Sequence, residues 1–247
     1  MISPALFAAV GEVGKGFIQE RDSSSLPCQA KPDEVFCFDW AKDHIDRFGT
    51  PTVQHLELVL FSVLLGFAIA FAISLLAHRT AWLRPPLLAA TGILYTIPSI
   101  AFFFLLLPIT GLGSTTAIVV LAAYTLQIIY RNTMLGLANV PESVKDAARG
   151  MGLTDRQILW RVELPLATPE IVAGLRIATV STVAIATLAV FIGAGGLGTQ
   201  MYGSGNLTFP TSIIIAAAIA IGMALLFDVA LLTVQRLITP WRRARLG

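Results

Sequence analysis

The stretch that organises this chain is ESVKDAARGMGLTDRQILWRVELP, residues Glu142–Pro165. It is the only long polar segment after residue 56, and strongly apolar segments lie on both sides of it. Apolar segments of about 20 residues are long enough to cross the hydrocarbon core of a bilayer. The stretch is therefore predicted to be a loop between membrane spans.

The residues of this loop predict two short helices joined by a sharp bend. Pro141 and Glu142 are typical of a helix start, because an acidic first turn suits the positive end of the helix dipole. Gly152 tolerates a positive φ and is expected at the bend. Thr154 can cap a second helix, which Pro165 is expected to end while it opens the next segment. Four apolar residues are expected to form one small face: Ala147, Ala148, Met151 and Leu153. Two short helices with small residues at their bend suit a groove in a partner protein, although an ordinary amphipathic connector is the alternative.

The composition of the 247-residue chain excludes an ordinary soluble domain. Hydrophobic residues make up 55% and charged residues only 13%, whereas soluble proteins carry about 25% charged residues. The mean hydropathy is +0.76. We therefore expect an all-α integral membrane protein.

Five membrane spans are expected along the chain, and the second contains Pro98, which predicts a kink. Their approximate bounds are Leu56–Ala77, Leu87–Pro108, Thr115–Leu137, Pro169–Ile192 and Thr211–Arg236. Residues 1–52 form an N-terminal segment and residues 53–247 a transmembrane domain, with the loop at 141–165.

The distribution of basic residues predicts the orientation of the spans. The twelve Lys and Arg residues after residue 52 lie in or beside the loops that follow spans one, three and five, whereas Ile109–Ser114 and Gly193–Pro210 contain none. By the positive-inside rule, the N-terminus lies outside, and the central loop and the C-terminus lie in the cytoplasm. The acidic first 52 residues fit the outer side.

No pattern in the sequence predicts catalysis, metal binding or nucleotide binding. The three histidines are scattered, and no His–Cys metal spacing or Walker lysine motif occurs. Gly193–Gly198 formally matches G-x-G-x-x-G, but it follows a membrane helix rather than a strand, and no acidic residue lies about 20 positions further on. We read these glycines as packing or gating residues. The chain is expected to be no enzyme, to hold no cofactor and to bind no nucleic acid.

The only two cysteines, Cys28 and Cys37, both precede the first span. On the oxidising outer side they are expected to form a disulfide, with two independent thiols as the alternative.

Glu57 begins the first predicted span and is expected at the outer interface, whereas Arg131, Arg176 and Asp228 lie deeper within predicted spans. Each costs ~2.5–3.5 kcal/mol at the bilayer centre on insertion scales, so a partner is expected. At 1.5 Å per residue, Arg176 and Asp228 lie ~10 and ~12 Å from the same membrane side. They are predicted to pair, with Arg131 as the alternative partner of Asp228. Direct contact with a transported solute is the other interpretation.

The loop resembles the EAA loop of bacterial ABC importer membrane subunits, which reads Glu-Ala-Ala, three residues, Gly, nine residues, Ile-x-Leu-Pro. The matching residues are Asp146, Ala147, Ala148, Gly152, Val162, Leu164 and Pro165, with Asp for Glu and Val for Ile. Five stretches are similar to the osmoprotectant branch of that family: 95–99, 130–133, 148–152, 158–165 and 193–198.

This resemblance, from about residue 53 to the C-terminus, implies a type I importer permease in the bacterial inner membrane. It implies a pathway for glycine betaine, choline, carnitine and related solutes, made by two membrane subunits. Two cytoplasmic ATPases, which hold ATP and Mg²⁺, would bind the loops, and a binding protein outside would deliver the solute. A methionine or other amino-acid importer subunit is the nearest alternative, and a non-transporting scaffold or sensor is a further one.

Overall fold

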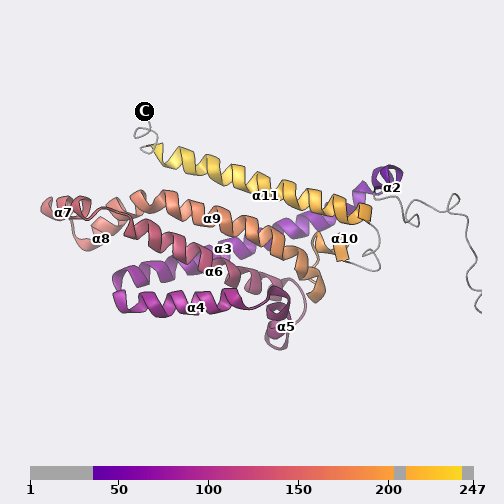
Figure 1. Cartoon of the computed structure of the whole chain (residues 1–247), viewed down its shortest axis with the longest axis horizontal. Coiled ribbons are helices and arrows are strands. Elements are labelled where there is room, and N and C mark those ends of the chain that lie inside the picture. The colour runs from indigo at the N-terminus through magenta and orange to yellow at the C-terminus, as the bar shows by residue number, and fades with distance from the viewer. Residues whose placement is uncertain (1–35, 203–209, 241–247) are drawn as a thin grey trace, which may run out of the picture.

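Long apolar helices lie side by side in the computed structural model, which describes residues 36–202 and 210–240 (Figure 1). In chain order the elements are α2 (Phe38–Asp43), η2 (Ile45–Phe48), α3 (Gly49–Arg79), η3 (Ala81–Leu83), α4 (Arg84–Thr96), α5 (Ser99–Thr110), α6 (Ser114–Ala138), α7 (Glu142–Gly150), α8 (Asp155–Ile158), η4 (Leu159–Glu163), α9 (Leu164–Ala186), η5 (Thr187–Ile192), α10 (Gly198–Tyr202) and α11 (Pro210–Ile238). The all-α prediction is confirmed for the part of the chain that the structure describes.

Four continuous helical segments are long and apolar enough to span a membrane, and a bent pair makes a fifth candidate. The four are Ile45–Arg79, Ser114–Ala138, Asp155–Ile192 and Pro210–Ile238. Each predicted span lies within one of these segments or the bent pair. The helix α3 begins at Gly49, so the boundary expected between residues 52 and 53 falls in its first turns.

The second predicted span is broken rather than kinked. Helices α4 and α5 meet at an angle of 101° on either side of Ile97 and Pro98. A proline disfavours the helical conformation of the residue before it, and Ile97 is extended with ψ 128°. The Tyr124 hydroxyl of α6 donates a hydrogen bond to the carbonyl of Ile97, which satisfies a group that the break removes from the helix. The break was predicted at the right proline, but its angle was not.

The prediction that Pro165 ends the second loop helix is wrong. Helix α8 continues through a five-residue π-helix, η4, directly into α9, with Pro165 in the first turn of α9. A proline ring clashes with the carbonyl four residues earlier in a regular helix. A π-turn locally changes the hydrogen-bond register of the helix, and here it directly precedes the proline. The helix that contains this span therefore begins before the expected span start at Pro169.

Close helix packing holds α6 against α9 at two glycines. A Cβ on Gly174 would lie 2.5 Å from the Cβ of Asn132, and one on Gly136 would lie 2.9 Å from the carbonyl oxygen of Ala167. Small residues allow this approach of two membrane helices. The main apolar core lies among α3, α5, α6, α9 and the start of α11.

The helices alternate in direction, so the connections gather at two ends of the molecule (Figure 1). Helices α7 and α8 and the C-terminal end of α11 lie at one end, here called the loop end. Helices α2, α5 and α10 lie at the opposite end, here called the glycine-loop end (Figure 1). The segment predicted as a loop from Gly193 to Pro210 contains α10, and its residues 203–209 lie outside the described part.

Candidate functional site

The predicted bend between the two loop helices is present at Gly152, whose φ is +82°. The N–H of Leu153 donates to the carbonyl of Ala148 at 3.2 Å, and the N–H of Gly152 to that of Arg149 at 2.9 Å. These bonds satisfy carbonyls at the end of α7, as glycine commonly does at a helix C-terminus. Apart from Gly152 and its two chain neighbours, no described residue has a heavy atom within 4 Å of the place that a Cβ on Gly152 would take. Glycine is therefore favoured at position 152 by the positive φ of the backbone and not by a lack of space for a side chain.

Thr154 begins the second loop helix, as its sequence position predicted. Its backbone N–H donates to Gln157 Oε1 at 2.8 Å, in a capping-box arrangement. This bond satisfies one of the free N–H groups at a helix start. The orientation of α8 is thus set by local sequence.

The four apolar residues expected on one loop face are divided between two faces. Ala148 is buried and Leu153 half-buried, whereas Ala147 and Met151 are exposed, Met151 at 72%. Successive residues on a helix point about 100° apart, so neighbouring alanines need not share a face. One alanine faces the bundle and the other is available to a partner.

The predicted coupling residue Asp146 lies in an exposed charge network on α7. Arg149 Nη1 donates to Asp146 Oδ1 at 2.7 Å and to Glu142 Oε1 at 2.9 Å. The bond from the Arg149 guanidinium lowers the pKa of the Glu142 carboxyl, and that carboxyl in turn raises the pKa of Arg149. Exposed pairs of this kind contribute little to stability.

A second, buried charge cluster lies on the other side of the loop and was missed by the sequence analysis. Glu163 is 6% exposed. Its Oε2 lies 2.7 Å from His78 Nε2, and its Oε1 lies 3.7 Å from Lys145 Nζ. An acidic residue between Val162 and Leu164, in an otherwise apolar motif, was the available signal.

The last two motif residues, Leu164 and Pro165, face the helix bundle. Leu164 is buried in an apolar cluster, and Pro165 is half-buried. The cluster joins α3, α6, η4 and α9 through these side chains: Phe67, Phe71, Leu75, Leu137, Leu159, Leu164, Ala167 and Ile171. The end of the motif therefore packs inside this chain.

Inside the spans, the expected contact between Arg176 and Asp228 is present. Arg176 Nε lies 2.9 Å from Asp228 Oδ1, and Nη2 lies 2.8 Å from Oδ2, which makes the pair bidentate. Gln235 lies one to two turns further along α11, where its Nε2 donates to the carbonyl of Pro169 at 2.7 Å. These bonds connect α9 with α11 at matching depth.

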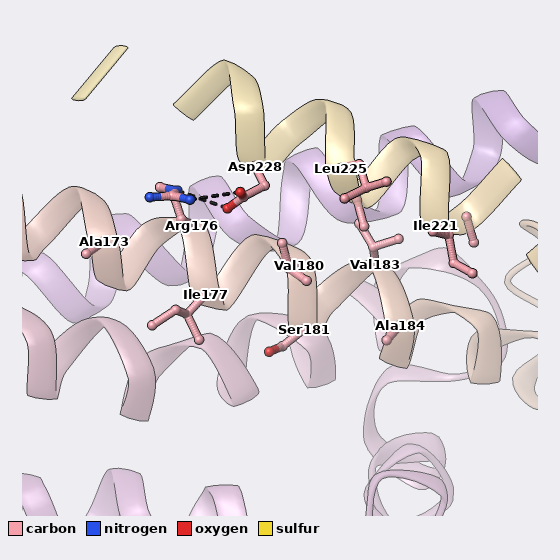
Figure 2. Close-up of a pocket in the computed structure, with 12 residues that line it drawn as sticks. Ala173, Arg176, Ile177, Val180, Ser181, Val183, Ala184, Ile221, Leu225 and Asp228 are labelled. Atoms are coloured by element: carbon pink, nitrogen blue, oxygen red, sulfur yellow. Dashed lines mark hydrogen bonds and ion pairs between the residues drawn. The ribbon is translucent and has the colours of Figure 1, made fainter. Parts of the chain in front are cut away.

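The Arg176–Asp228 pair closes one end of a groove between α9 and α11 (Figure 2). The groove encloses about 680 Å³ and is otherwise almost wholly apolar. The two side chains are 24% and 34% exposed in the single chain. Charged groups in a membrane face protein or a water-filled cavity rather than lipid, so this side of α9 and α11 is expected to face one of these two environments.

Arg131 lies in a different cavity and does not contact Asp228 in this way. That cavity holds about 840 Å³ between α4, α6 and α9, and its lining includes Tyr95, Gln127 and Arg131. Thr91 Oγ1 and Gln127 Oε1 lie 2.6 Å apart beside it. Tyr95 lines this cavity, whereas Phe102 and Phe103 are buried in the core.

The glycine-rich segment packs against the start of α3. Gly193, Gly195 and Gly196 have φ values of +71°, +79° and +82°. The N–H of Gly196 donates to Gln54 Oε1 at 3.1 Å, and the ring of the fully buried His55 hydrogen-bonds through Nε2 to the carbonyl of Val183 at 3.0 Å. This backbone is engaged by its own chain, in keeping with a packing role rather than a nucleotide site.

The N-terminal cysteine site is only partly described. Cys37 is buried and disulfide-bonded, and its N–H donates to Thr211 Oγ1 at 2.9 Å. Cys28 lies outside the described residues, so its pairing with Cys37 stays a prediction. Among the described residues, no group of three or more His, Cys, Asp or Glu side chains could hold a metal ion.

Comparison with known proteins supplies the family. A family model for the binding-protein-dependent transport system inner membrane component matches residues 62–244. The chain is 35% identical to the choline transport system permease protein OpuBD of Bacillus subtilis, over 82% of this chain and 88% of that protein. It is 36% identical to the carnitine transport permease protein OpuCB of Listeria monocytogenes, over 79% and 91%. It is also 36% identical to the osmoprotectant import permease protein OsmW of Salmonella typhimurium, over 80% and 94%.

Solved structures agree on the fold. The chain superposes on a subunit of the inward-facing MetNI methionine ABC transporter with a TM-score of 0.73 at 24% identity, covering 80% of this chain and 99% of that one. A histidine-bound amino acid ABC transporter gives a TM-score of 0.68 at 21% identity, over 81% and 98%. With the EAA-like loop between two spans and a family match over most of its length, the chain belongs to the binding-protein-dependent transport system inner membrane components, the multi-pass permease subunits of ABC importers.

Proposed function

We propose that this chain is the permease subunit of an ATP-driven importer for osmoprotectants such as glycine betaine, choline and carnitine. The observation that carries this proposal is a sequence identity of about 35% with choline, carnitine and osmoprotectant permeases over about four-fifths of the chain. The two cavities beside α9 are candidates for the path of a small solute.

The loop at 141–165 is the proposed contact with cytoplasmic ATPase subunits, which bind and hydrolyse ATP with Mg²⁺. This chain would contribute no nucleotide site of its own. The exposed Ala147 and Met151, which adjoin the exposed charges of α7, support a docked surface at this end. Closure of the ATPases would move the loop and, with it, the spans in an alternating-access cycle.

Two further partners complete the proposed importer. A second membrane subunit, either another copy or a paralogue, would share the pathway. A solute-binding protein would deliver solute from outside. The half-exposed Arg176–Asp228 pair supports a protein-covered or water-filled environment for α9 and α11 in such an assembly.

The proposed orientation puts the loop end in the cytoplasm and residues 36–48 outside. Arg79, Arg84 and the basic residues of the loop support it, because they gather at the loop end (Figure 1). A reporter fused after residue 247 would be active in the cytoplasm if this orientation is right. A periplasmically active reporter at that position would contradict it.

Uptake of labelled solutes tests the substrate class. Cells that carry the full transporter should import glycine betaine, choline or carnitine, and cells that lack this chain should not. Import of methionine instead would favour the amino-acid alternative, for which the related solved structures support only the fold. Binding of a solute-loaded partner without any import would favour the scaffold or sensor alternative.

A further inference from the structure

A buried carboxylate joins three separate segments at the loop end. Glu163, the last residue of η4, contacts His78 near the end of α3 and Lys145 on α7. The residue is 6% exposed, and the side chains of His78 and Lys145 are 18% and 15% exposed. These residues are here called the Glu163 cluster.

Burial of this carboxylate is tolerable only because it is paired. A buried charge without a partner is strongly unfavourable, and loss of one partner of a buried pair is costlier than loss of an exposed pair. Lys145 also reaches Glu142 Oε2 at 3.1 Å, so the cluster connects with the exposed charges of α7. The network thus extends from the exposed face of α7 to the C-terminal end of α3.

The apolar contacts at this end do not fix a direction of movement. Phe67, Phe71 and Leu75 of α3 meet Leu159 and Leu164 in an apolar cluster, and apolar burial is non-directional. At the bend, backbone hydrogen bonds hold the end of α7 to Gly152 and Leu153. The Glu163 cluster adds the directional side-chain link that joins α7 to α3 and η4.

We propose that Glu163 is a positioning residue that transmits the displacement of α7 to α3 and α9. A push on α7 acts on Lys145, through Lys145 on Glu163, and through Glu163 on both the start of α9 and His78 of α3. This inference rests on the proposed function, in which an ATPase moves the loop. It assigns the transmission to one carboxylate that the EAA pattern leaves as a variable position.

The test is the number of solute molecules imported per ATP hydrolysed, measured with the complete complex in proteoliposomes. Glu163→Gln should lower this ratio at least about fivefold, the lower end of usual coupling between two sites. Glu163→Asp, which keeps the charge on a shorter side chain, should restore part of the ratio. Glu57→Gln makes the same chemical change at the exposed opposite end of α3 and should match the wild type.

The outcomes separate this inference from the proposed function. If the wild-type complex imports no osmoprotectant, the proposed function fails. If the wild type imports solute and the Glu163→Gln complex keeps the wild-type ratio, Glu163 is not a transmitting residue, even where the yield of complex falls. Should Glu163→Gln yield no complex, His78→Gln decides in the same way: a lowered ratio supports the inference and an unchanged ratio overturns it.

Discussion

The segments that precede and follow α9 are held by opposite means. At the loop end, charged side chains make directional contacts, and no described residue other than its chain neighbours lies within 4 Å of the place that a Cβ on Gly152 would take. At the glycine-loop end, uncharged groups make the contacts, and Gly195 and Gly196 lie directly against Gln54 and His55. The first arrangement tolerates changes of angle, whereas the second requires close steric fit.

This difference indicates where movement enters the molecule. The loop end leaves open space at its bend and depends on the paired charges of the Glu163 cluster, while the glycine-loop end is tightly packed. We therefore expect displacement of the loop to reach α3 and α9 through the Glu163 cluster, and the glycine-loop end to keep α3 and α9 together. The predictions below alter the middle and then each end of α9 in turn.

A large effect is expected in the middle of α9, where Arg176 pairs with Asp228. Arg176→Gln or Asp228→Asn alone strands a charge within the membrane and should cost about 2 kcal/mol, less than the ~3–5 kcal/mol of a fully buried pair because both side chains are partly exposed. The double variant should recover part of this loss. Folded yield and the thermal midpoint of the purified complex measure it. Purely additive losses would show that the residues are not energetic partners.

A matched pair of glycine substitutions compares the two ends directly. Gly152→Ala and Gly195→Ala both place a side chain at positive φ, which costs ~1–2 kcal/mol. Gly195→Ala also displaces Gln54, so the N–H of Gly196 loses its acceptor, a further ~0.5–1.5 kcal/mol. The thermal midpoint should therefore fall further for Gly195→Ala. Equal shifts would remove the proposed contrast between an open and a packed joint.

The smallest effect is expected for Glu142, on the exposed side of the loop. The hydrogen bond from Arg149 holds the pKa of this carboxyl below its ordinary value of 4.5. A lowered folded-state pKa means that the carboxylate stabilises the fold above pH 4.5 and that this contribution is lost as the pH falls through the lowered pKa. Glu142→Gln should thus be slightly less stable than the wild type near neutral pH and equal to it in acid. If the stability difference between Glu142→Gln and the wild type grows as the pH falls, the pKa of Glu142 is not lowered in the folded protein.

Sequence reasoning located the features that depend on local chemistry. Gly152 at the bend, Thr154 at the helix start and the break at Pro98 follow from the conformational limits of single residues. The pairing of Arg176 with Asp228 followed from equal depth on consecutive antiparallel spans. That pairing could be predicted from the sequence positions of the two residues and the direction of their spans alone.

Features that depend on three-dimensional packing were not predictable in this way. The continuation of α8 into α9 past Pro165 depends on a π-turn, which no local pattern announces. The Glu163 cluster joins residues 78, 145 and 163, and the buried His55 contacts a segment more than 120 positions away. The 101° angle between α4 and α5 is likewise fixed by contacts such as that of Tyr124 with Ile97.

The central claim is that the loop couples ATP hydrolysis to import, and Gly152→Asp tests it most directly. The variant should insert and fold at the ~1–2 kcal/mol cost of a side chain at positive φ, because the described residues leave open space at the site, but the added carboxylate should not fit the groove of an ATPase. In proteoliposomes that contain the complete complex, ATP-driven uptake of labelled glycine betaine should fall at least about fivefold relative to the wild type. Wild-type uptake and wild-type solute-stimulated ATP hydrolysis by the Gly152→Asp complex would contradict the claim.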